Sequence, residues 1–140
     1  MSVQLSDLWT VAGIILGFQL AAFSWRISRE LEMRAKRDIT WLPPADILNL
    51  VSMAVVVIGV FALPILGLAD LTLTQRLFGL GLLLFLGYPF ALVGHYRLFK
   101  PGHTEATYFS LQEKLVLAII LLISIVYLIS AFADQARSWL

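Results

Sequence analysis

Apolar residues fill most of the chain in four long runs, and short polar segments separate these runs. The runs cover about residues 8–25, 46–68, 77–96 and 114–132. A helix needs about 20 apolar residues to cross the hydrocarbon core of a bilayer, which is about 30 Å thick. The pattern therefore predicts an all-α membrane protein. We expect four transmembrane helices in an up-down bundle that forms a single domain over residues 1–140.

Composition agrees with this prediction. The chain is 60% hydrophobic and only 14% charged, whereas soluble domains are about 45–50% apolar and about 25% charged. The absence of cysteine excludes disulfides and thiolate chemistry. No basic residue precedes the first apolar run, so we expect this run to be a retained span and not a cleaved secretory signal.

The polar segment from Trp25 to Asp46 sets the expected orientation. It contains five of the ten basic residues, namely Arg26, Arg29, Arg34, Lys36 and Arg37. Short loops rich in Lys and Arg tend to stay in the cytoplasm. With Arg97, Lys100 and Lys114, eight basic residues lie on this side of the predicted membrane and two on the other. We therefore expect both termini outside the cytoplasm (N-out, C-out), in a bacterial inner (plasma) membrane.

The first helix is predicted to continue past Trp25 as a cytoplasmic extension. Arg26 and Glu30 are four residues apart and opposite in charge, as are Glu30 and Arg34. Such pairs stabilise an exposed helix. Pro43 disfavours helical geometry in the residue before it, and Pro44 suits the first turn of the next helix.

Small residues in the first run predict a close helix contact. Gly13, Gly17 and Ala21 recur every four residues, and a ridge of this kind lets a second helix backbone approach. The contact could lie within the bundle or between two copies of the chain. Gln19 is a strongly polar side chain deep in the same run, so we expect it to form an interhelical hydrogen bond.

Four local signals concern the other helices. Pro64 removes the hydrogen bond to the carbonyl of residue 60, which predicts a kink. Thr72 and Gln75 have the spacing of a capping box for the third helix, as Ser110 and Glu113 have for the fourth. The third run is rich in glycine, so we expect it in the middle of the bundle.

Ionisable residues converge at the expected cytoplasmic boundary. Folding the two hairpins together would bring the following residues to a similar depth: Arg26, Asp46, Asn49, His95, Arg97, Glu113 and Lys114. Arg26, Arg97 and Lys114 could hold an anionic headgroup or a small acidic ligand, with His95 responding to protons. The simpler interpretation, which we favour, is that charges pair with one another at helix ends.

Several kinds of chemistry have no support in the sequence. His95 and His103 are the only histidines, too few for a zinc site or for a bis-histidine haem in one chain. The G-x-S-x-G element of hydrolases, the phosphate loop and the dinucleotide fingerprint are absent. Acidic residues interrupt the basic segment, which argues against nucleic-acid binding. We expect no enzyme activity, no metal and no cofactor.

The function predicted from these features is that of an accessory subunit. We expect the chain to lie in the lipid bilayer and to associate with itself or with other membrane proteins, in a homo-oligomer or a larger complex. The alternative is a homo-oligomeric channel or small-solute transporter. No ionisable residue falls at the centre of a predicted span, and transport pathways usually place such residues there. This argument favours the accessory subunit.

Overall fold

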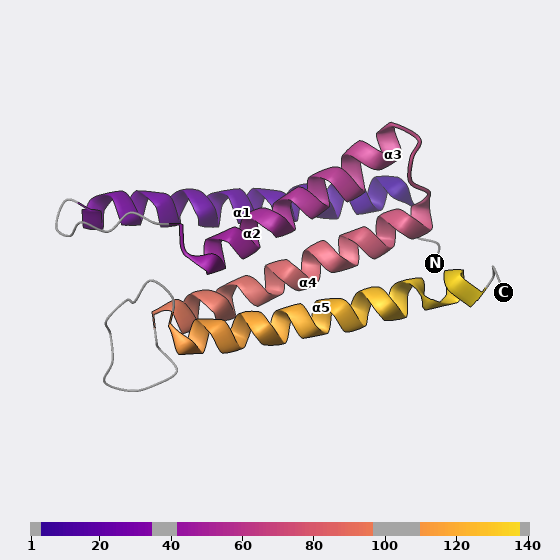
Figure 1. The fold of residues 1–140 in the computed structure, drawn as a ribbon. Coiled ribbons are helices and arrows are strands. Elements are labelled where there is room, and N and C mark those ends of the chain that lie inside the picture. Colours follow the sequence, from indigo (N-terminus) through magenta and orange to yellow (C-terminus); the bar gives the residue numbers. More distant parts are fainter. Residues whose placement is uncertain (1–3, 35–41, 97–109, 138–140) are drawn as a thin grey trace.

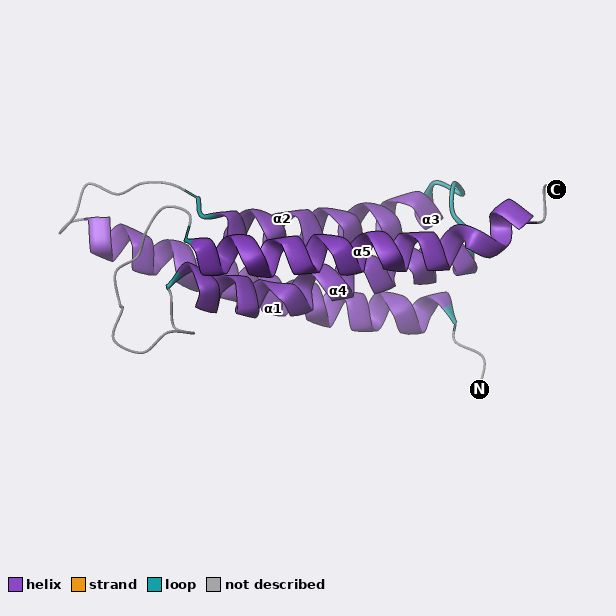
Figure 2. Ribbon diagram, turned by 60° about the horizontal axis from the view of Figure 1, so that its bottom comes forward, coloured by secondary structure: helices purple, strands orange, loops and turns teal. Residues whose placement is uncertain are grey.

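A computed structural model describes residues 4–34, 42–96 and 110–137 of the chain, and these residues contain helices and short connections without a strand (Figures 1 and 2). Helix α1 spans Leu5–Arg34. The second helical element begins as α2 (Pro44–Val56), continues as the π-helical turn η1 (Val57–Ala62), and ends as α3 (Leu63–Ile65). Helix α4 spans Leu71–His95, and α5 spans Leu111–Arg137.

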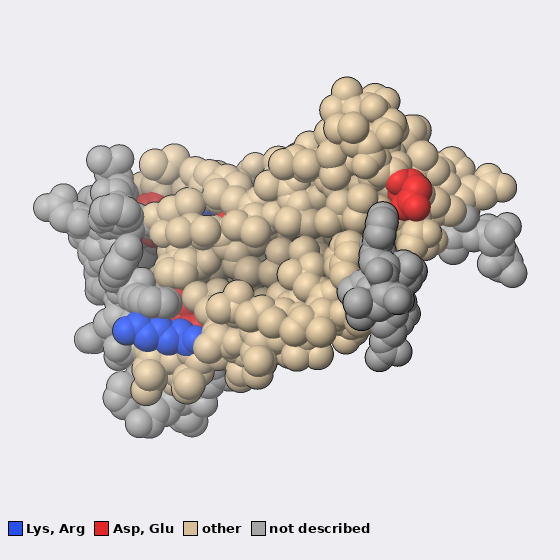
Figure 3. Space-filling model, turned by 45° about the vertical axis from the view of Figure 1, so that its right-hand side comes forward, with Lys and Arg blue, Asp and Glu red and all other residues tan. Residues whose placement is uncertain are grey.

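Four of these elements are long and apolar enough to cross a membrane, over Leu5–Glu32, Pro44–Ile65, Leu71–His95 and Leu111–Ala133. On the face seen in Figure 3, charged side chains lie toward the two ends, and the surface between them is uncharged. Large apolar side chains are exposed along that surface, for example Leu122 and Ile129 of α5. These features identify a multi-pass integral membrane protein and confirm the four predicted membrane-spanning helices.

Helix α4 contacts all the other long helices. It packs most extensively against α2 and α5, whereas α1 makes a smaller contact with α2 and α4 (Figure 1). Glycines allow the close approach: an added Cβ at Gly81 would lie 2.5 Å from Val56, and one at Gly87 would lie 2.6 Å from Ile120. The expectation that the glycine-rich third helix occupies the middle of the bundle is confirmed.

Two apolar clusters fill the interior. One joins α2, α4 and α5 and contains Ala45, Leu84, Tyr88, Ala91 and Ile120. The other joins α1 to the second helical element around the junction of α2 and η1, and contains Leu8, Ala12, Val56 and Val60. Leu16 of α1 packs against the second cluster. The side of α1 that carries Leu8, Ala12 and Leu16 therefore faces the bundle.

The predicted N-cap of the third helix, Thr72, was wrong by two residues. Helix α4 begins at Leu71, and its N-cap is Asp70, whose Oδ1 accepts a hydrogen bond of 2.7 Å from the backbone N–H of Leu73. Thr72 therefore lies inside the helix and does not cap it. An aspartate is a strong N-cap, and the earlier start lets Thr74 become a buried residue of the helix.

The segment before Pro64 departs from α-geometry, as the proline predicts. Residues Val57–Ala62 form a π-helical turn. In a regular helix residue 64 would donate to the Val60 carbonyl, but proline has no N–H. The indole of Trp9 donates to that carbonyl instead, at 2.7 Å. The irregular turn is thus tied to α1 by a side chain that compensates for the missing backbone donor.

Candidate functional site

The predicted boundary residues separate into groups in the structure. Arg26, Asp46, His95 and Glu113 are buried and come together where α1, α2, α4 and α5 approach one another. Lys114 lies on the exposed side of α5. Asn49 belongs to a separate group with Gln19. Arg97 lies outside the described residues.

Arg26 is the centre of the first group. Its guanidinium donates to Glu30 in a close ion pair and to the Tyr96 hydroxyl at 2.7 Å. A second nitrogen of the guanidinium lies 3.7 Å from Asp46 Oδ2. The side chains of Arg26 and Asp46 are 1% and 3% exposed, so both charges are removed from solvent. The predicted pair of Arg26 with Glu30 is confirmed, and Arg26 links α1 to both α2 and α4.

Two tyrosines that the sequence interpretation missed complete this group. The Tyr88 hydroxyl donates to Asp46 Oδ1 at 3.3 Å, and the Tyr96 hydroxyl lies 3.4 Å from Glu30. Burial raises the pKa of the Tyr96 phenol, so this hydroxyl stays protonated and can donate to Glu30 while it accepts from Arg26. A tyrosine inside an apolar helix is itself a signal, because its hydroxyl needs a partner when it is buried.

Glu113 is the centre of the second group. Its Oε1 accepts a hydrogen bond from the backbone N–H of Ala45 at 3.0 Å, and its Oε2 lies 3.0 Å from His95 Nδ1. The carboxylate is fully buried. It therefore caps the start of α2 and pairs with the last residue of α4, although it belongs to the first turn of α5.

The predicted capping box at Ser110 forms only in half. Ser110 Oγ accepts from the backbone N–H of Glu113 at 3.1 Å, as expected, and donates to the Gly94 carbonyl at 2.5 Å. The reciprocal bond from the Glu113 side chain is not made, because that carboxylate is engaged with Ala45 and His95. Ser110 and Glu113, which were expected to cap α5 only, therefore join α5 to α2 and α4.

A third polar group lies deeper in the bundle. Gln19 Nε2 donates to Ser52 Oγ at 2.7 Å and lies 3.3 Å from Asn49 Oδ1, while Ser52 donates to the Gly81 carbonyl at 2.7 Å. Gln19, Asn49 and Ser52 are fully buried. The expected interhelical bond of Gln19 is therefore present, and it joins α1, α2 and α4.

The ridge of Gly13, Gly17 and Ala21 lies on the opposite side of α1. All three residues are exposed, and an added Cβ at Gly13 or Gly17 would meet nothing within 4 Å. Gly17 precedes Gln19 by two residues and Ala21 follows it by two. Two residues correspond to a rotation of about 200° around the helix axis. The ridge therefore makes no close helix contact within the described part of the chain, and a contact with a second molecule is the alternative that stays open.

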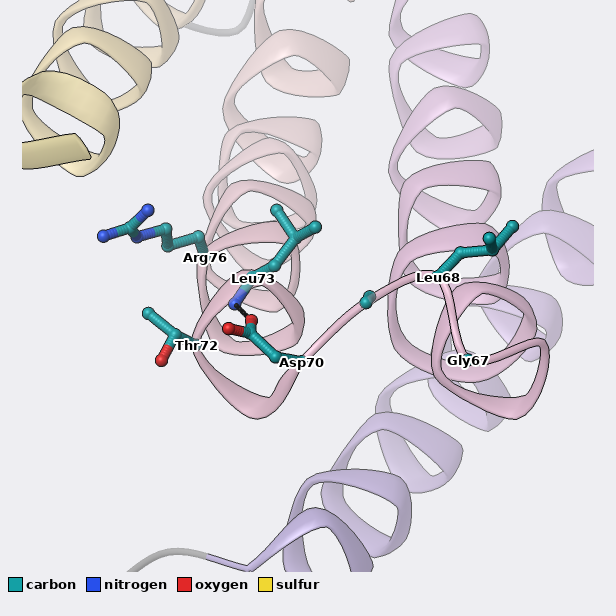
Figure 4. A pocket seen from close by; sticks show the side chains of 7 residues that line it. Gly67, Leu68, Asp70, Thr72, Leu73 and Arg76 are labelled. Carbon is teal, nitrogen blue, oxygen red and sulfur yellow. Dashed lines mark hydrogen bonds between the residues drawn. The ribbon is translucent and has the colours of Figure 1, made fainter. Parts of the chain in front are cut away.

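A hollow of about 690 Å³ lies elsewhere, at the connection between α3 and α4 (Figure 4). Gly67, Asp70, Thr72 and Arg76 contribute to its lining. The Asp70 carboxylate beside this hollow caps α4, and the Arg76 guanidinium lies 5.1 Å from the centre of the Phe132 ring. The polar groups of this hollow serve the local fold, so we do not place a functional site there.

The three polar groups join the helices through ion pairs and hydrogen bonds. Within residues 4–34, 42–96 and 110–137, no group of three or more His, Asp or Glu side chains is placed to hold a metal ion. No protein-family model, curated protein or solved structure matches the chain. The function is therefore inferred from the arrangement of these side chains and from the exposed face of α1.

Proposed function

We propose that the protein is a non-catalytic accessory subunit of the membrane that binds a second copy of itself or another membrane protein through the outer face of α1. One observation carries this proposal. The side of α1 opposite Gln19 carries an exposed stripe of small side chains from Ser6 to Ser28, flanked by exposed Ile14, Phe18 and Leu20. The stripe consists of Ser6, Thr10, Gly13, Gly17, Ala21, Ser24 and Ser28.

The composition of this face is unusual for a surface in contact with lipid chains only. The exposed side of α5 consists of large aliphatic residues, including Leu115, Ile119 and Leu122, which are 57%, 56% and 63% exposed. Helices associate in lipid mainly through close backbone packing, which small residues permit. The difference between the two helices supports α1 as the surface for a partner.

The proposed topology is an up-down bundle, N-out and C-out, in a bacterial inner membrane. The unequal distribution of Lys and Arg, eight against two, supports this orientation. A reporter that is active only in the cytoplasm should work when it is inserted near Lys36 and should fail when it is fused after Leu140. Activity at the C-terminus would overturn the orientation.

The contact is tested by Gly17→Leu, which places a large side chain on the proposed face. Crosslinking between copies and recovery of partners from native membranes should both fall about tenfold. Thermal stability in detergent should stay near that of the parent, because nothing lies within 4 Å of the added Cβ. Ala118→Leu is the matched control, since Ala118 is exposed on α5. Equal association of both variants and the parent would exclude the α1 face as the contact.

The alternative function, a homo-oligomeric channel or small-solute transporter, would use the same contact between copies. In one chain the described charges of the first two groups are paired near one end, at Arg26, Asp46, His95 and Glu113. A pathway would therefore have to form between copies. Conductance of liposomes that contain the purified protein separates the two functions, and the accessory subunit predicts no conductance above that of empty liposomes.

A further inference from the structure

Arg29 is an exposed arginine held between two aromatic rings where α1 leaves the bundle. Its guanidinium carbon lies 5.7 Å from the centre of the Trp25 ring and 5.5 Å from the centre of the Tyr96 ring. Both distances are within the range of cation–π attraction. The rings therefore restrict the position of the guanidinium group.

The hydrogen-bond donors of Arg29 have no partner in the part of the chain that the structure describes. The nearest acid in sequence, Glu30, pairs with Arg26 and lies near the Tyr96 hydroxyl. Arg26 also faces Asp46. The sequence offered anion binding by Arg26, Arg97 and Lys114 only as the less favoured alternative, and Arg26 is buried beside two carboxylates. Arg29 is the neighbouring cation that keeps its donors available.

The depth of Arg29 corresponds to the lipid headgroups. It lies four residues beyond Trp25, where the first apolar run ends, which is about 6 Å along the helix at 1.5 Å per residue. Trp25 is 62% exposed, and aromatic residues are enriched at the level of the headgroups. A phosphate group of a lipid can therefore reach the guanidinium from the side of Trp25.

We propose that Arg29, stacked between Trp25 and Tyr96, binds the phosphate group of an anionic ligand at the membrane boundary. The planar fork of a guanidinium matches two phosphate oxygens, and such charge-assisted bonds are stronger than neutral ones. Stacking fixes the fork before binding and reduces the entropy lost on binding. A lipid headgroup and free phosphate share this chemistry, and both are candidate ligands.

No acid forms an ion pair with Arg29 among the described residues. Glu30 and Asp46 both face Arg26, and the next acid on the helix, Glu32, is exposed. Three further basic residues follow in sequence, Arg34, Lys36 and Arg37. A basic segment beside a membrane attracts anionic lipids.

The test measures ligand-induced thermal stabilisation of the full chain in detergent. The probes are phosphatidylglycerol and phosphatidylcholine in matched mixed micelles, and inorganic phosphate against chloride at equal ionic strength. Arg29→Gln should raise the apparent Kd for phosphatidylglycerol about tenfold, as expected for the loss of one charge-assisted contact. Arg34→Gln removes the same charge five residues further along α1 and should change the Kd less than twofold.

Two further variants separate the stacked geometry from charge alone. Arg29→Lys keeps the charge but loses the fork, and should raise the Kd about threefold. Trp25→Leu keeps the charge but removes one of the two rings beside Arg29, and should also raise the Kd about threefold. Because Arg29 is exposed and makes no hydrogen bond within the described residues, Arg29→Gln should fold normally, and its melting temperature without ligand checks this.

The outcomes separate the possible ligands. Selective loss of phosphatidylglycerol binding in Arg29→Gln supports the proposal with a lipid headgroup as the source. If Arg29→Gln weakens the binding of inorganic phosphate alone, the proposal is supported with free phosphate as the ligand. Equal weakening by Arg29→Gln and Arg34→Gln would show attraction by net charge only and would overturn the proposal. The absence of any stabilisation of the parent by either probe would also overturn it.

Discussion

Helix α4 is joined to α5 and to α1 by two different kinds of contact. Toward α5, glycines bring the backbones together: an added Cβ at Gly94 would lie 3.0 Å from backbone atoms of Glu113, and Tyr127 packs over Gly79. Toward α1, polar side chains supplement apolar packing by Ala22 and Phe78. Gln19 reaches the group around Ser52 and Gly81, and Arg26 bonds to Tyr96.

The difference shows two ways in which helices of one chain can associate in lipid. The hydrophobic effect does not drive helices together there, so association depends on close packing and on hydrogen bonds. Helices α2, α4 and α5 use close packing. Helix α1 adds hydrogen bonds at three levels, through Trp9, Gln19 and Arg26, to its apolar contact. Its opposite face is exposed.

The largest effect should come from Arg26→Met. This change leaves Asp46 buried without its cation, and breaking a buried pair in this way typically costs about 3 kcal/mol or more. The measurement is the apparent free energy of unfolding in detergent. The double variant Arg26→Met/Asp46→Asn should lose less than the single variant, because the one carboxylate then left without its cation, Glu30, is 37% exposed. A double variant as unstable as Arg26→Met would show that Asp46 is not the partner of Arg26.

Gly94→Ala tests the glycine contact. The added Cβ would meet the backbone of Glu113 and of Gln112, at 3.0 and 3.1 Å, and a backbone cannot move aside as a flexible side chain can. We expect a loss of about 2 kcal/mol from overpacking. Gly13→Ala is the control, because nothing lies within 4 Å of that Cβ, and it should be neutral or slightly stabilising. Equal effects of the two changes would contradict the contrast between α4 and α1.

Gln19→Leu should have a smaller effect, about 1 kcal/mol, which is typical of a hydrogen bond between membrane helices. Ser52 keeps its bond to the Gly81 carbonyl in this variant, so only the α1 part of the group is lost. A double-mutant cycle with Ser52→Ala measures the coupling. Strict additivity of the two changes would mean that the bond between Gln19 and Ser52 contributes nothing to stability.

Trp9→Phe should have the smallest effect, about 0.5 kcal/mol, since it removes one donor and keeps most of the ring. The effect should shrink further in a Pro64→Ala background, because an alanine at that position can donate to the Val60 carbonyl. Thermal unfolding of the four proteins of this cycle gives the comparison. If the loss is the same in both backgrounds, the indole does not replace the missing backbone donor.

Sequence reasoning succeeded where a contact lies within one helix. The spacing of Arg26 and Glu30 predicted their ion pair, and the position of Ser110 predicted its bond to the N–H of Glu113. It failed at Thr72, because Asp70 offers a competing cap two residues earlier. Spacing along the sequence predicts such contacts once the first residue of the helix is known. For α4, the sequence did not identify that residue.

The sequence by itself determined the four spans, the polar ends and the central place of the glycine-rich helix. Only the tertiary structure decided that Glu113 caps α2, that Asn49 pairs with Gln19, and that Gly13 and Gly17 face outward. The physical reason is that membrane helices are apolar on nearly every side, so hydrophobic periodicity does not report their rotation. Partners on different helices depend on that rotation and on relative depth, which are set when all the helices pack together.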